Sequence, residues 1–413
     1  MLTRNVRLPR DVILLYTLLS LIGPLVALQA STKLKVDRIR VKNILTDSDL
    51  KSIDTYVSLS LDRMLLSENQ NELDKIRKEI IASAKSNSQT VSTRLMYNQR
   101  FVSTVQSQYA RVFNKAVDLE DLDMAQHVEL GLSIVISQLD HSDLCGDLIA
   151  LLNKKNASIR YWGLKGLSSK TISNHLLTLD ATNDLIRNLV AGFRNALNDQ
   201  TNALVLSKIV AAASLPKFPE ALEVIPDCLE KRWEFYNQWK VSDELIDIAM
   251  IQTTLEMVGN GSLAENTAMR NVLLYSVGKL FSAGLQRYQM GLRYKDKEDK
   301  SLILLDTASQ HKLQSLLIES ERAFRKACSR IDRTISGNSR LVKAIQSQNW
   351  TSIEETFDKL IGPDGEVDRV LKFYSGDHKF PYPSIAAPPE SVIEQAKIRQ
   401  YVAENTYKML EKQ

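Results

Sequence analysis

Four residues of the types that bind metal ions lie close together near the start of one predicted helix. They are His141, Asp143, Cys145 and Asp147. His141 and Cys145 are spaced i, i+4, so on a helix they would share a face and could hold a metal ion together. A fixed site needs further ligands, and the sequence contains no matching CxxC or HxxxH pair. Acidic residues and histidine at a helix N-terminus more often cap the helix, so we predict no metal site and no cofactor.

Motifs that would supply a catalytic mechanism are missing from the sequence. It contains no glycine-rich phosphate loop, no Gly-x-Ser-x-Gly elbow and no recognisable set of nucleophile, base and orienting residue. We therefore predict no catalytic residue. An all-helical extracytoplasmic enzyme remains the alternative, for example a carbohydrate-active one with paired carboxylates, because a sequence does not reveal which Asp and Glu side chains meet in space.

An aromatic run, Trp233-Glu-Phe-Tyr-Asn-Gln-Trp239, is the candidate for binding a partner. Trp233 and Tyr236 continue an apolar stripe with helical spacing, so we assign them to the core. Phe235 and Trp239 lie four residues apart, which places them on a different face of the predicted helix. They are either a second buried contact or an exposed anchor for a partner chain or a glycan, since aromatic side chains offer a large apolar area at small entropic cost.

The elements that carry these residues are predicted to be helices. The clearest is Asn156 to Leu167, where Asn156 can cap the helix and Ile159, Gly163, Gly166 and Leu167 follow at i, i+4, i+7 and i+8 of one face. Two glycines on that face lower helix propensity. We expect them where another helix backbone approaches closely.

Paired helices recur along the central part of the chain. The predicted pairs are 144–152 with 156–167, 183–197 with 203–215, and 219–239 with 243–258. Their second helices begin near Ser158, Ala203 and Asp243, a period of roughly 40 residues. The pattern predicts an all-α fold of stacked antiparallel helix pairs, an α-solenoid, with an irregular helical bundle as the alternative.

The first of these repeats resembles a known family. Its residues match the Asp/Asn-x-x-Val-Arg-x-x-Ala-x-x-Ala-Leu pattern of HEAT-type repeats at Asn156, Ile159, Arg160, Gly163, Gly166 and Leu167. The next repeat, 203–213, keeps the apolar spacing but has no arginine in the equivalent place. The resemblance covers about a third of the chain. It implies a scaffold or binding surface and no shared active site.

Residues 1–30 have the order of an export signal. Three arginines up to position 10 are followed by an almost entirely apolar run from Val12 to Ala30. We expect a cleaved signal peptide or a single membrane anchor, with everything after Ala30 translocated. The segment carries three arginines and one aspartate, so its removal lowers the net charge from +4 to +2. That balance predicts no general attraction to nucleic acid.

The rest of the chain is expected to form three parts. Residues 31–120 are predicted to be an N-terminal helical subdomain, 121–361 the helical-repeat array, and 362–413 a Pro-rich linker and a terminal helix. Residues 380–389 cannot be regular helix because of their prolines, so they should form an extended linker or a strap. Three cysteines in separate predicted helices do not indicate a disulfide framework, although one bridge and one free thiol would be compatible with the count.

These observations predict an exported or membrane-anchored scaffold that presents a protein-binding surface. Its location would be extracytoplasmic, either periplasmic or secreted, or anchored by one N-terminal helix, which would then be its contact with the membrane. A protein partner is expected, and a glycan is possible through Phe235 and Trp239.

The first testable prediction concerns the mature N-terminus, which we expect at or near Ser31 because Leu28-Gln29-Ala30 precedes it as a small-residue cleavage site. N-terminal sequencing of the native protein measures this. An intact Met1 in a soluble cytosolic fraction would contradict both the signal and the anchor.

Overall fold

A computed structural model describes residues 31–198, 202–215, 219–261, 263, 266–296, 300–372 and 381–410, the last seven by their backbone alone. The predicted signal or anchor over 1–30 lies outside the described residues. Within them the chain is mainly helical, and strand is confined to two antiparallel two-residue segments, β1 (Tyr294–Lys295) and β2 (Ser301–Leu302). The predicted all-α fold is confirmed.

The chain forms two compact units, Met1–His175 and Leu176–Gln413. The boundary lies at the end of the helix Lys170–Leu176, inside the stretch 121–361 that the sequence indicated as one array. The first unit begins with a helical stretch over 31–39. It continues with α2 (Asp47–Leu65), α3 (Gln70–Ser83), α4 (Val91–Val117), α5 (Leu122–Gln138), the 3-10 turn η1 (Ser142–Leu144), α6 (Cys145–Leu151), α7 (Ala157–Leu167) and α8 (Lys170–Leu176).

Helices of the first unit pack on helices two places further along the chain. The contacts join α2 to α4, α3 to α5 and α5 to α7. Buried tyrosines fill the space between α2, α3 and α4, where Tyr56 and Tyr97 both pack against Phe101. The Tyr97 hydroxyl donates to the Ser83 carbonyl at 2.8 Å, and the Tyr56 and Ser83 hydroxyls lie 3.1 Å apart. Each buried polar tip therefore has a partner, as burial requires.

The glycines of α7 lie where the sequence predicted a close approach. A Cβ added at Gly163 would lie 2.9 Å from the Leu151 Cβ and 3.0 Å from the Leu148 carbonyl oxygen of α6. A Cβ at Gly166 would lie 3.0 Å from the Cα of Ser137 on α5. The predicted backbone contact is confirmed, and any side chain at either position would push these helices apart.

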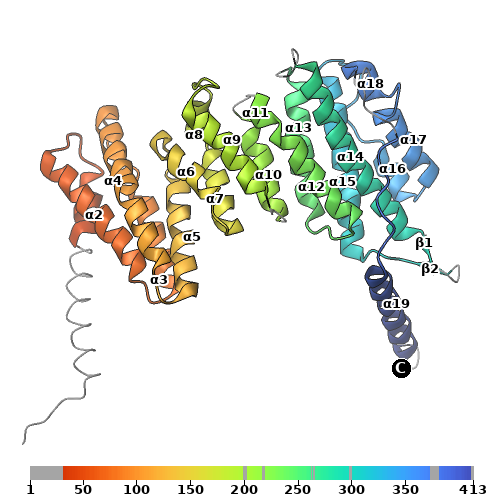
Figure 1. Ribbon diagram of the computed structural model, residues 1–413, viewed down its shortest axis with the longest axis horizontal. Helices are drawn as coiled ribbons and strands as arrows, with labels where there is room; N and C mark the ends of the chain where they lie inside the picture. The colour runs from red at the N-terminus through yellow and green to blue at the C-terminus, as the bar shows by residue number, and fades with distance from the viewer. Residues whose placement is uncertain are drawn as a thin grey trace, which may run out of the picture. The chain divides into compact units, whose positions relative to one another are not determined.

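The second unit contains more and longer helices. They are α9 (Asp184–Leu197), α10 (Ala203–Ala213), α11 (Pro219–Leu222), α12 (Val224–Asn237), α13 (Glu244–Gly259), α14 (Thr267–Leu292), α15 (Thr307–Ser329), α16 (Leu341–Gln346), α17 (Trp350–Ile361), α18 (Glu366–Leu371) and α19 (Glu390–Leu410). Helix α12 packs on α10 and α14, and α13 packs on α10 and α15, so α12 to α15 lie side by side (Figure 1). Phe281 of α14 packs on Phe324 of α15 and Phe357 of α17, with ring centroids 5.8 and 5.1 Å apart.

A buried carboxylate joins α15 to the short helices that follow it. Glu321 is fully buried and accepts from the Arg340 and Leu341 amides at 2.8 Å each, which caps the start of α16. It also accepts from the Ser339 hydroxyl and from the Arg325 Nε, the latter at 2.8 Å, and the Arg325 guanidinium pairs with Glu366 at the start of α18. Because the charges are paired and hydrogen-bonded, their attraction offsets the desolvation penalty of burying them.

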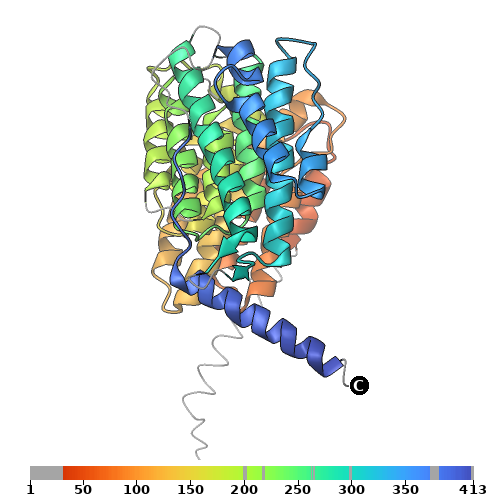
Figure 2. The same cartoon turned by 90° about the vertical axis from the view of Figure 1, so that its right-hand side faces the viewer.

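The Pro-rich segment is extended, as predicted. We call Pro381 to Pro389 the strap; it runs alongside the helices of the second unit into α19, which projects away from them (Figure 2). Ile393 and Ala396 of α19 are buried, whereas Ile398 and Tyr401 are exposed.

All three cysteines are free and buried. Burial raises the pKa of the Cys145 and Cys328 thiols to about 12 and raises that of Cys228 as well. Protonated buried thiols react slowly, because the thiolate is the nucleophile. The compatible alternative of one disulfide bridge is not formed. Among the helices that the structure describes, none is both long and apolar enough to cross a membrane.

Glycine replacement tests the close approach of α7. We expect Gly163→Leu to lower the free energy of unfolding by about 1 to 3 kcal/mol through overpacking. Gly146→Leu is the matched control on α6, because a Cβ there meets nothing within 4 Å. It should leave stability unchanged or raise it by up to about 1 kcal/mol through helix propensity. Urea unfolding of both variants measures the difference, and equal effects would remove the support for close packing.

Candidate functional site

Helix α12 ends inside the aromatic run, which separates the two residues predicted to act together. It stops at Asn237, so Phe235 lies on the helix and Trp239 lies beyond it with a left-handed φ of 58°. The expected shared helix face is therefore wrong. Phe235 is half-buried, with the Arg232 guanidinium 5.6 Å from its ring centre. Trp239 contacts a different guanidinium, that of Arg287, which lies 5.6 Å from its ring centre.

Trp239 is covered by the chain's own strap. Its side chain is 7% exposed, and its indole N–H donates to the Ala386 carbonyl at 2.8 Å. The exposed anchor that the sequence left open is therefore not present at Trp239. The segment that covers its indole ring belongs to the same chain. A bulky residue in the left-handed region costs about 1 kcal/mol or more, so the turn is held by burial and by this hydrogen bond.

The two aromatic residues assigned to the core behave differently. Tyr236 is fully buried as expected. Trp233 is only half-buried, which corrects the sequence-based assignment, and the Lys279 ammonium lies 3.8 Å from its ring centre. Lys279 also pairs with Glu230 at 2.6 Å. The face of α12 toward α14 is thus a charged and aromatic surface, since a cation can stabilise an indole ring that is not fully buried.

A buried ion pair connects α12 to α13. Arg232 donates to both Asp247 carboxylate oxygens, at 2.6 and 2.8 Å, and to the Ser242 carbonyl at 3.1 Å. The Tyr236 hydroxyl donates to the same carboxylate at 2.9 Å. Burial by itself lowers the pKa of Arg232, whereas the hydrogen bonds to Asp247 raise it. The net effect is a pKa above the ordinary value. The bidentate geometry supplies the strong interaction that buried charges need.

A second guanidinium, that of Arg287 on α14, is buried with poorer pairing. Its Nη2 lies 3.8 Å from Glu244, and its Nε and Nη1 have no hydrogen-bond partner among the described residues. It stacks over the rings of Tyr236 and Trp239, at 5.9 and 5.6 Å from their centres. Burial lowers the pKa of Arg287 below its ordinary value, because nearby opposite charges only partly offset desolvation.

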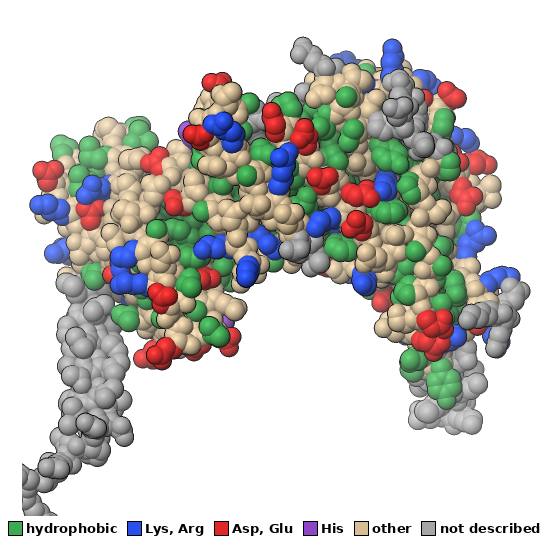
Figure 3. Space-filling view, in the orientation of Figure 1, with side chains coloured by type: hydrophobic (Ala, Val, Ile, Leu, Met, Phe, Trp, Pro, Cys, Tyr) green, Lys and Arg blue, Asp and Glu red, His purple; other side chains and the backbone are tan. Residues whose placement is uncertain are grey.

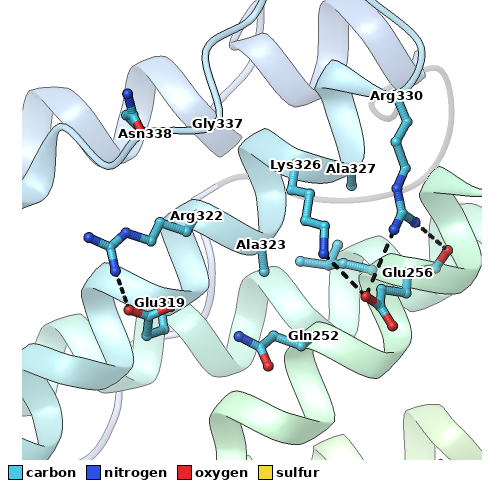
Figure 4. Close-up of a pocket in the computed structure, with 11 residues that line it drawn as sticks. Gln252, Glu256, Glu319, Arg322, Ala323, Lys326, Ala327, Arg330, Gly337 and Asn338 are labelled. Carbon is cyan, nitrogen blue, oxygen red and sulfur yellow. Dashed lines mark hydrogen bonds and ion pairs between the residues drawn. The ribbon is translucent and has the colours of Figure 1, made fainter.

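A groove of about 480 Å³ runs between α13 and α15. The helices cross closely there, since a Cβ added at Gly259 would lie 2.9 Å from the Ala327 Cα. The floor is small and apolar, formed by Leu255, Ala323 and Ala327. Charged side chains line the rim, and Figure 4 shows Lys326 and Arg330 reaching from α15 toward Glu256 on α13.

The carboxylates of this groove are each paired with a cation. Glu256 lies 3.4 Å from the Lys326 ammonium and 3.8 Å from Arg330, and Glu319 pairs with Arg322 at the other end. Paired-carboxylate catalysis needs one carboxyl group to give up a proton and one to act as base or nucleophile. Neither carboxylate is left unpaired for such work. The groove is suited to binding, because an apolar floor with a polar rim is the anatomy of a protein interface.

The residues considered for metal binding serve structural roles. The His141 Nδ1 accepts from the Asp143 amide at 3.3 Å and so caps η1, while Cys145 is buried. The described residues contain no group of three or more His, Cys, Asp or Glu that could hold a metal ion.

Sequence reasoning missed the groove and the buried pair. The groove had a readable signal, since Arg322, Lys326 and Arg330 are spaced i, i+4, i+8 beside the alanines of α15. The pair had a weaker one, because Asp247 interrupts the otherwise apolar helix 243–258. Nothing in the sequence identified Arg232 as its partner.

The described residues define the class of protein as all-α, with a buried ion pair and an open charged groove in its second unit. Comparisons with protein-family models, curated proteins and solved structures find no match.

Removing one member of the buried ion pair tests its role. We expect Asp247→Ala to cost about 3 to 5 kcal/mol of unfolding free energy, because Arg232 would be left buried and unpaired. Glu355→Ala is the control, since Glu355 pairs with Lys359 on the exposed face of α17, and it should cost less than about 1 kcal/mol. Chemical denaturation measures both, and similar small costs would show that the buried pair contributes little.

Proposed function

We propose that the chain is an exported helical-repeat scaffold whose groove between α13 and α15 binds a protein partner. The single observation that carries the proposal is the groove itself, with Leu255, Ala323 and Ala327 as its floor and charges of both signs on its rim. Small floor residues leave room for apolar side chains of a partner. The rim charges would select a partner with a complementary pattern, which acts mainly on specificity and association rate.

Two further observations support the scaffold. Helices that pack on helices two places along the chain, such as α12 on α14 and α13 on α15, are compatible with stacked pairs and with the HEAT-type resemblance at 156–167. On the face seen in Figure 3, Lys and Arg side chains are interspersed with Asp and Glu, which suits specific protein contacts better than attraction to a polyanion. Export rests on the sequence of residues 1–30.

Charge reversal on the groove rim provides the test. Lys326→Glu changes a 62% exposed side chain beside Glu256, and Lys359→Glu changes a 68% exposed one beside Glu355 on α17. The two variants alter the same charge in similar ion pairs, and each should change stability by less than about 1 kcal/mol. A difference in binding between the two variants would then be due to where the reversed charge lies, on the groove rim or on α17.

We expect the wild type and Lys359→Glu to capture the same protein from the native envelope fraction, and Lys326→Glu to lose about tenfold or more of it, because a like charge would face the partner. Quantitative mass spectrometry of tagged baits measures this. Higher salt should weaken capture by the wild type, since rim charges are screened. Equal capture by both variants would exclude the groove as the binding surface.

A further inference from the structure

The strap contacts the second unit with every third residue. Tyr382, Ile385 and Pro388 are buried, whereas Ser384, Ala386 and Ala387 between them are exposed. A period of three is that of a polyproline II helix, which has three residues per turn and no internal hydrogen bonds. The prolines of the strap favour this conformation. It therefore presents one apolar edge to the helices, with an aromatic, a branched aliphatic and a proline side chain in order.

Tyr382 occupies a site that α14 shapes for an aromatic ring. Its ring lies 5.5 Å from Tyr275 and 6.4 Å from Phe357 between centres. Gly278 forms the wall of this site, because an added Cβ would lie 2.2 Å from the Tyr382 hydroxyl oxygen and 2.6 Å from its Cζ. Only glycine at 278 admits the ring in this position. Aromatic-lined sites of this kind are a recurring way to bind proline-rich segments.

The hydrogen bonds to the strap go to its main chain. Gln286 accepts from the Ile385 amide at 2.8 Å and donates to the Pro383 carbonyl at 3.1 Å. Asn237 accepts from the Ala386 amide at 2.7 Å, and Trp239 donates to the Ala386 carbonyl at 2.8 Å. Main-chain bonds are available to any extended peptide, so the site recognises a conformation and three side chains.

We propose that the surface formed by α12, α14 and α17 is a recognition site for proline-rich segments, and that the strap is its built-in occupant. The ligand is a partner protein's extended segment with the pattern Tyr-x-x-Ile-x-x-Pro, which competes with the strap. This inference is independent of the groove between α13 and α15, because it uses other residues. The strap itself defines the chemistry of the ligand.

Trp239 is strained at the point where it contacts the strap. Trp239 adopts a left-handed conformation in which a bulky side chain is strained, and backbone strain concentrates at ligand sites. Behind the indole, the buried Arg287 guanidinium lacks partners for two of its nitrogens.

The test uses the full chain with the strap released. Tyr382→Ala combined with Ile385→Ala removes two of the three docked side chains and leaves the helical site intact. The probe is a fluorescent peptide with the sequence of residues 380–390, and its binding is followed by fluorescence polarisation. We expect the released variant to bind it about 10- to 100-fold more tightly than the wild type, in which the strap occupies most sites.

Two controls make the result specific. Adding Gly278→Ala to the released variant should abolish binding, because the Cβ fills the tyrosine site while helix propensity improves. A second peptide that keeps only Tyr, Ile and Pro at positions one, four and seven, with Ala, Ser and Pro elsewhere, should bind, and a scrambled version should not. Binding that ignores Gly278→Ala, or that is equal for the scrambled peptide, would overturn the proposal.

Hydrogen exchange on the unaltered chain keeps the proposal testable if the released variant does not fold. The Ile385 and Ala386 amides should exchange through strap opening, faster than the buried helix amides that require global unfolding. Exchange of these two amides only with global unfolding would make the strap a permanent structural element and refute the proposal. If the released variant and the wild type formed stable mixed dimers, the site would bind the strap of a second copy. That result would overturn the assignment of the site to a partner protein's segment.

Discussion

A guanidinium as deeply buried as that of Arg232 is tolerated only while a carboxylate faces it, because an unpaired charge in the interior carries a large desolvation penalty. Asp247 supplies that carboxylate from α13. The pair thereby joins α12 to α13, one turn before α12 ends at Asn237. Trp239 leaves the helix there, and α14 packs on the same helix. Asn237 and Trp239, which hydrogen-bond the strap, therefore follow closely on a residue of this buried pair.

Two buried arginine clusters join different helices of the second unit. Arg232 connects consecutive helices in the middle of the unit, and Arg325 connects α15 to α16 and α18 through Glu321 and Glu366. Both use bidentate or multiple hydrogen bonds, which give geometric specificity as well as energy. Among the described residues, the Nε and Nη1 of Arg287 have no hydrogen-bond partner, and the Nη2 of Arg325 has none either.

The helices could be predicted because their signals are local. Periodicity located the stripes of α7 and α13, and the glycines at 163 and 166 indicated a close contact without identifying the neighbour. Interactions between distant residues could not be predicted in this way. Nothing in the sequence pairs Arg232 with Asp247, and helical spacing alone continued α12 through Trp239, past its actual end. The prolines of the strap predicted that it is extended. Its hydrogen bonds to the helices could not be predicted, because they use the main chain and so do not depend on the residue types of the strap.

The three buried thiols make the folded chain indifferent to the redox potential of its surroundings. Cys145, Cys228 and Cys328 are protonated and enclosed, so thiol–disulfide exchange has neither a thiolate nor an accessible sulfur to begin with. The folded chain contains no bridge among its three cysteines, so its maturation requires no disulfide formation. Each sulfur is open to oxidation until its helix is packed, so oxidative loss during folding would depend on how fast folding encloses it.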